Sequence, residues 1–221
     1  MSKLKISNLI LFLIIAFSVS CKTSKKFYFN NHVIPETKIY KFVNENDSND
    51  IVYWEMFYTT KDTFVTNTYD SNLFLTNEFV ETLDHSGSKL IKYTSYYEFH
   101  DQPAKANITK DDVFSWTTTD PIQYEVNYRV EQDQISILKE RKYLSDQKII
   151  FNNRFIKTKI FKDSFIVTEN SKVLDSTYNI SYYAKGLGVI QFNSHIGQEI
   201  NKMKLDKILT KNEFQALKTY R

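Results

Sequence analysis

The chain has 221 residues, of which 42% are hydrophobic and 25% are charged, and its formal net charge is +3. Without Lys3 and Lys5, which precede the first apolar run, 27 Lys and Arg face 26 Asp and Glu, so the chain lacks the basic excess of nucleic-acid-binding proteins. The single cysteine excludes an internal disulfide, and about 200 residues are enough for one substantial hydrophobic core.

The first predicted element is a signal peptide. The apolar run from Leu9 to Val19 is too short for a membrane-spanning helix, which needs about 20 apolar residues. It follows two lysines and ends in the small residues Ser18 and Ser20, which is the pattern of an export signal. A buried core helix is the alternative, but the run has no polar face. Residues 1–20 are therefore predicted to be removed on export.

Cys21 follows the predicted cleavage site directly. Cleavage by ordinary signal peptidase after "SVS" would leave a free thiol at the first residue. The stretch Ser18–Cys21 also resembles the lipobox of bacterial lipoproteins, although serine stands where leucine is commonest. The resemblance implies that diacylglycerol is attached to the Cys21 sulfur. We therefore expect a lipid-anchored linker over residues 21–30 and a single β-rich domain over residues 31–221.

The segments after residue 38 have the period of β-strands. Five apolar residues from Ile122 to Val130 alternate with polar ones, as in a strand with one buried face. Residues 51–58 are apolar on both faces except at Glu55, which indicates a strand covered on both sides. One face would carry Trp54, Met56 and Tyr58, and the other would carry Ile51, Tyr53 and Phe57.

Further strand-like segments separated by short polar turns predict an antiparallel meander. We expect eight to ten strands, with residues 101–116 as a crossing segment that contains loop or helix-start residues at Asp111 and Asp112. No segment from 38 to 193 has the apolar period of a helix, so βαβ units are not expected. The predicted fold is mainly β, an antiparallel meander forming a half-open or closed barrel with a short C-terminal helix. A barrel is favoured because it pairs the strand edges that an open meander would expose.

The C-terminal tail has a different pattern. Met203, Leu205, Ile208 and Leu209 are spaced at helix intervals, and Thr210 with Glu213 forms a capping box. A helix is predicted over 211–219, with its apolar stripe covering an edge or end of the sheet. The stripe, Phe214 and Leu217, is too narrow to favour the alternative, a helix lying on a membrane.

Two glycines, Gly186 and Gly188, lie between late strands and predict a tight turn or bulge. A phosphate-binding loop is not supported, because a third glycine and a Lys-Ser/Thr pair are missing. The segment "YYAKGLGVIQF" is similar to a motif near the C-terminus of many exported bacterial lipoproteins. Those proteins look like the antiparallel half-barrels of periplasmic lipoprotein carriers, and the resemblance implies a curved sheet with a concave apolar face.

No catalytic or metal-binding motif emerges from the chain. The four histidines are scattered, and none lies three or four residues from another histidine or from Cys21. No G-x-S-x-G motif occurs. Glu55, alone on an apolar strand, is a candidate buried acid, and an edge-facing or salt-bridged role is the alternative. We predict no enzyme activity, no cofactor and no metal.

Two functions are consistent with these features. In the first, the protein is anchored to a bacterial envelope membrane, on its periplasmic face or at the cell surface. It binds an apolar ligand or lipid in the concavity of its sheet. The candidate ligand-binding residues are Trp54, Phe57 and Trp116. Alternatively the core is filled, and the protein is an assembly component of the envelope that acts through protein contacts. Neither function involves nucleic acid.

Overall fold

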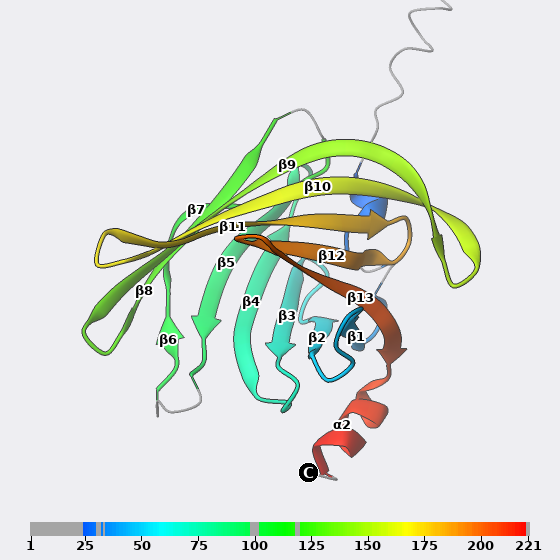
Figure 1. Cartoon of the computed structure of the whole chain (residues 1–221), viewed down its shortest axis with the longest axis horizontal. Helices are drawn as coiled ribbons and strands as arrows, with labels where there is room; N and C mark the ends of the chain where they lie inside the picture. The colour runs from blue at the N-terminus through cyan, green and yellow to red at the C-terminus, as the bar shows by residue number, and fades with distance from the viewer. Residues whose placement is uncertain (1–23, 30–31, 33, 98–101, 118–119, 220–221) are drawn as a thin grey trace, which may run out of the picture.

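A computed structural model describes residues 24–29, 32, 34–97, 102–117 and 120–219. Within these residues the chain forms one 13-stranded antiparallel sheet, and β4 pairs with β5 to close the ring (Figure 1). The predicted barrel is thus present in its closed form. All strands except β6, a two-residue strand beside β5, belong to the ring.

The elements have the following bounds: η1 (Lys25–Phe27), β1 (Lys38–Asn44), β2 (Ile51–Tyr58), β3 (Thr63–Tyr69), β4 (Leu75–Leu83), β5 (Gly87–Ser95), β6 (Ala104–Lys105), β7 (Asn107–Ser115), β8 (Ile122–Val130), β9 (Asp133–Phe151), β10 (Arg154–Glu169), β11 (Lys172–Ala184), β12 (Gly188–Ile196), β13 (Glu199–Leu209) and α2 (Lys211–Thr219). Sequential strands are neighbours almost throughout, and β1 pairs with β13. The described part of the chain contains no helix long and apolar enough to span a membrane.

In two segments the structure has a strand where the sequence pattern predicted another conformation. Residues 107–115 form β7 rather than a loop or helix start, because they pair with β5 and β8. Asp111 and Asp112 lie 3.3 and 3.2 Å from Lys89 of β5. Residues 199–209 form β13 rather than part of a helical pattern. Met203 and Leu205 lie two residues apart and are both buried, which is the period of a strand.

The predicted face assignments of two strands are confirmed. Tyr124, Val126 and Tyr128 of β8 are buried on one face. On β2, Met56 belongs to the main core, together with the partly buried Trp54 and Tyr58. Tyr53 faces the other way and contacts Phe214 of α2, so β2 is covered on both sides.

Helix α2 lies on the outer face of the barrel (red in Figure 1). The predicted capping box is present, since the Thr210 N–H donates to Glu213 Oε2 at 2.7 Å and the Glu213 N–H donates to Thr210 Oγ1 at 3.3 Å. Fully buried Phe214 packs on Tyr53 and Tyr69, with ring centroids 5.4 and 5.2 Å away. The helix thus packs on outward-facing side chains near strand ends at one rim of the barrel, and the closed ring leaves it no open edge to cover.

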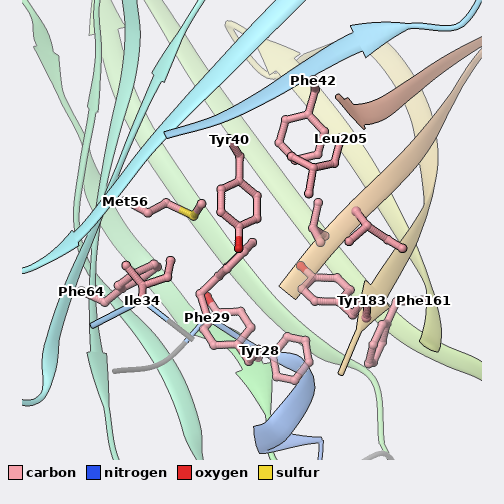
Figure 2. Packing of buried hydrophobic residues seen from close by; sticks show 14 of the residues in the cluster. Tyr28, Phe29, Ile34, Tyr40, Phe42, Met56, Phe64, Phe161, Tyr183 and Leu205 are labelled. Atoms are coloured by element: carbon pink, nitrogen blue, oxygen red, sulfur yellow. The ribbon is translucent and has the colours of Figure 1, made fainter. Parts of the chain in front are cut away.

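The segment 24–29, which we call the plug, crosses one end of the barrel. The Ser24 N–H donates to the carbonyl of Trp116 after β7, and the Gly186 N–H of the β11–β12 turn donates to the carbonyl of Lys26. Tyr28 and Phe29 are buried beside Tyr183 and Tyr40, as Figure 2 shows. The predicted linker, residues 21–30, therefore contributes side chains to the core.

Candidate functional site

A cavity of about 450 Å³ lies inside the barrel. Such a volume is in the range of sites for small ligands. Tyr28 and Phe29 of the plug line one part of it. Its apolar walls come from strands all around the ring: Val52, Trp54, Phe79, Val113, Tyr124, Phe165, Tyr183, Val189 and Phe192.

A buried ionic cluster lies on the β9–β10 wall of this cavity. Arg141 donates from Nε and Nη2 to the two carboxylate oxygens of Asp163, at 2.6 and 2.9 Å. The Ser181 hydroxyl donates to Asp163 Oδ2 at 2.8 Å. Lys139 Nζ lies 3.5 Å from the same oxygen. The register explains the geometry, because Arg141 pairs directly with Asp163, and Lys139 follows two residues away on the same face.

Aromatic rings surround the two cations of the cluster. The Arg141 guanidinium lies 5.0 Å from the ring centroid of Tyr183 and 5.3 Å from that of Phe114. The Lys139 ammonium lies 5.2 Å from the Phe165 ring and 5.6 Å from the Tyr124 ring, both of which line the cavity. Cation–π attraction therefore replaces part of the water that each cation loses.

Burial and the neighbouring charges shift the pKa values of the cluster. Burial, together with repulsion from Arg141, lowers the pKa of Lys139 to about 8. Burial opposes ionisation of Asp163 as well, but Arg141 and Lys139 outweigh it and hold the Asp163 pKa below its ordinary value. Asp163 is thus a carboxylate shared by two cations.

Glu81 of β4 is a second buried acid on the cavity wall. Its Oε2 accepts hydrogen bonds from the hydroxyls of Tyr28 in the plug and Ser88 on β5. Burial raises its pKa, against the lowering effect of these two hydrogen bonds. Glu81 is therefore stabilised by hydroxyl groups and favours its protonated form more than an exposed glutamate does.

Uncharged polar groups line the part of the cavity near the β3–β4 turn. The Thr68 and Thr76 hydroxyls are 2.8 Å apart, and the Tyr93 hydroxyl donates to Asn77 Oδ1 at 2.7 Å. Thr68, Thr76 and Asn77 are partly exposed and line the cavity together with Asp70. The cavity thus has an apolar middle, a charged side wall and a polar rim.

The three predicted ligand-binding residues occupy different places. Trp54 lines the cavity and stacks on Phe192, with ring centroids 5.6 Å apart and planes 8° apart. Phe57 lies three residues further along β2, on the opposite face of the strand, and does not line the cavity. Trp116 packs against Tyr28 of the plug and donates from Nε1 to the Asp84 carbonyl at 2.8 Å. Only Trp54 therefore faces the site.

The other residues singled out in the sequence lie in turns or in hydrogen-bonded positions outside the cavity wall, or outside the described residues. Gly186 and Gly188 have φ angles of +78° and +80°, the left-handed geometry expected of the turn. Glu55 accepts hydrogen bonds from Tyr69 and Asn67 at 2.8 and 3.2 Å. Cys21 lies outside the described residues. Within the residues that are described, no three His, Cys, Asp or Glu side chains are grouped to hold a metal ion.

The charged cavity residues were missed at the sequence level, although a signal exists. Glu81 lies between Phe79 and Leu83, and Asp163 lies between Phe161 and Phe165, each two residues away. Lys139 and Arg141 likewise interrupt an apolar face that includes Ile137 and Tyr143. Because residues two apart share a strand face, a charge in such a row predicts a buried ionisable group.

Comparisons with known proteins identify the fold. No family model and no curated protein matches the sequence. A solved structure from Parabacteroides distasonis, described as a lipoprotein, aligns with a TM-score of 0.51 at 8% identity, over 86% of this chain and all of that one. This likeness confirms, for the fold, the resemblance to exported lipoproteins inferred from the sequence.

Two further solved structures align less closely. One is an exported protein of Bacteroides fragilis with a YmcC-like fold, at a TM-score of 0.44 and 10% identity over 79% of this chain and 94% of that one. The other is the hypothetical lipoprotein YmcC of Escherichia coli, at a TM-score of 0.38 and 10% identity over 80% of this chain and 88% of that one.

Proposed function

We propose that this protein is a non-enzymatic binding protein of the bacterial cell envelope that holds an apolar ligand inside its barrel. The observation that carries the proposal is the cavity of about 450 Å³ lined by aromatic and aliphatic side chains. A filled barrel would bury these side chains against one another, whereas here they surround space that a lipid chain can occupy.

Membrane attachment through Cys21 is part of this proposal. The short apolar run, the small residues before Cys21 and the lipoprotein description of the Parabacteroides distasonis structure support it. Ser24 hydrogen-bonds to the barrel end at Trp116, and three residues of chain reach at most about 10 Å. A lipid on Cys21 would therefore hold the plugged end of the barrel near the membrane, on the periplasmic face or at the cell surface.

The direct test is native mass spectrometry of residues 22–221, exported by a bacterial host and never exposed to denaturant. We expect an excess mass that disappears on denaturation and is identified as a lipid. A variant with a filled cavity, Val52→Trp, should lose this mass, because Val52 lines the cavity. Phe57→Trp is the matched control, since it adds a tryptophan to the opposite face of the same strand and should keep the ligand.

A bare chain mass, with a lipid-carrier control still loaded, would overturn the ligand proposal. It would favour the second candidate function, an assembly role through protein contacts. The four most exposed large apolar side chains among the described residues lie on two hairpins that such contacts could use. Ile150 and Phe155 belong to the β9–β10 hairpin (67% and 77% exposed), and Val173 and Leu174 lie on β11 beside the β10–β11 turn (64% and 58% exposed).

A further inference from the structure

The β9–β10 wall of the cavity carries two cations, Lys139 and Arg141, and one anion, Asp163. Arg141 and Asp163 form a two-point ion pair, and the Ser181 hydroxyl adds a third hydrogen bond to the Asp163 carboxylate. Lys139 reaches that carboxylate only at 3.5 Å. Among the described residues, no other ion pair is formed by Lys139, so one cation of the cluster is incompletely compensated.

Glu81 does not supply the missing negative charge through an ion pair. Its carboxyl group is bonded to the hydroxyls of Tyr28 and Ser88. Burial raises the pKa of Glu81 above its ordinary value. Asp70, the remaining acid that lines the cavity, accepts hydrogen bonds from the N–H groups of Asn72 and Phe74 in the β3–β4 turn.

The ammonium of Lys139 is placed where a ligand could reach it. Its side chain is 14% exposed and lines the cavity between the rings of Phe165 and Tyr124. A buried cation that shares its carboxylate partner with a second cation costs free energy unless a further anion compensates it. The apolar walls that extend from this point, including Phe79 and Trp54, suit a hydrocarbon chain.

We propose that the ligand is a hydrocarbon chain ending in an anionic group of the carboxylate type, and that the anion pairs with Lys139. This inference rests on the proposed binding function and names its ligand class. The polar end of the ligand lies at the β9–β10 wall, and its chain lies among the aromatic rings inside the barrel. A cationic headgroup would be repelled by Lys139 and Arg141, and a neutral one would leave Lys139 with only the carboxylate that it shares with Arg141.

The test compares three ligands with the same chain: dodecanoate, dodecanol and dodecylammonium. Binding to residues 22–221 is measured by calorimetric titration at pH 7, each ligand below its micelle-forming concentration. We expect dodecanoate to bind at least tenfold more tightly than dodecanol, and dodecylammonium to bind most weakly. Lys139→Met should abolish the preference for dodecanoate over dodecanol.

Lys159→Met is the matched control. Lys159 is also a buried lysine of the β9–β10 pair, 2.9 Å from Asp146, but it does not line the cavity. Its replacement should keep the preference for dodecanoate, and circular dichroism should show both variants folded. Equal binding of dodecanoate and dodecanol, or tighter binding of dodecylammonium, would overturn the headgroup inference and leave the binding function intact. No binding of any of the three, together with a bare native mass, would overturn the binding function itself.

Discussion

Arg141 and Asp163 are a buried ion pair whose two charges depend on each other. Their side chains are 6% and 3% exposed, so loss of Asp163 would leave the Arg141 charge uncompensated inside the barrel. Such pairs add little net stability compared with apolar residues, but loss of one member is costly. We interpret the ion pair as a contact that fixes the position of β9 relative to β10 in the wall of the cavity.

The two buried acids should affect stability with opposite dependence on pH. The Asp163 pKa is held below its ordinary value of 3.8, so its contribution is present above about pH 4 and is lost as the pH falls further. The Glu81 pKa is raised above 4.5, so stability is lost as the pH rises through the folded-state value.

At neutral pH, Asp163→Asn should therefore destabilise the protein by about 3–5 kcal/mol. Glu81→Gln should leave stability equal or increase it, with a smaller decline as the pH rises from 4 to 7. Urea unfolding at a series of pH values measures both effects. Parallel curves for the wild type and Glu81→Gln would contradict the assignment of Glu81 as a buried acid.

Lys139 should reduce the stability of the unliganded protein. Burial lowers its pKa from an ordinary 10.5 to about 8, so the cost of its charge is present below about pH 8 and disappears as the pH rises toward 10. Lys139→Met should raise the free energy of unfolding at pH 7 by roughly 1–3 kcal/mol. The gain should shrink at pH 10 in denaturant titrations of delipidated protein. A loss of stability at pH 7 would show that Lys139 has a structural role.

At the scale of elements, the β11–β12 turn holds the plug against the barrel through the hydrogen bond from Gly186 to Lys26. Gly186 and Gly188 share nearly the same φ, but their surroundings differ. A Cβ at Gly186 would meet no atom within 4 Å, whereas one at Gly188 would lie 2.2 Å from the Phe29 ring. The second glycine is therefore required for contact with the plug as well as for backbone geometry.

This difference predicts unequal effects of the same substitution. Gly186→Ala should cost about 1–2 kcal/mol from the left-handed backbone alone. Gly188→Ala should cost clearly more, because Phe29 must move out of its packed position. Thermal unfolding of the two variants gives the comparison. Equal melting temperatures would mean that Phe29 adjusts freely and that the plug is loosely held.

Helix α2 is stabilised by one buried side chain. Phe214 is fully buried between Tyr53 and Tyr69, whereas Leu217 is 41% exposed. Phe214→Ala should lower the free energy of unfolding by about 3–5 kcal/mol. Leu217→Ala on the same helix should change it by no more than about 0.5 kcal/mol. Chemical denaturation distinguishes this arrangement from one in which both residues of the predicted stripe contact the sheet.

At the scale of the whole molecule, anchor and barrel should be separable. The proposed anchor depends on Cys21, which precedes the plug, whereas the core is formed by residues that follow it. Cys21→Ser should leave the melting temperature unchanged and move the protein from the membrane to the soluble fraction. Fractionation of the expressing cells measures this. Continued membrane association of the serine variant would refute the lipid anchor.

The sequence by itself was sufficient to predict the mainly β meander, the faces of β2 and β8, and the capped C-terminal helix. These features depend on local periods and on contacts between residues near in sequence, such as Thr210 with Glu213. The helical interpretation of residues 203–209 was wrong, because the pairing of β13 with β1 and β12 overrides a short ambiguous apolar pattern.

Only the tertiary structure decided whether the barrel closes and what its interior contains. Closure depends on the pairing of β4 with β5 within a ring that also joins β1 to β13, partners far apart in the chain. The cavity, with its cluster of Glu81, Lys139, Arg141 and Asp163, brings together residues from the plug and from nine strands. Local sequence patterns indicate which face of a strand is buried, but the space left inside is determined by how all the strands assemble.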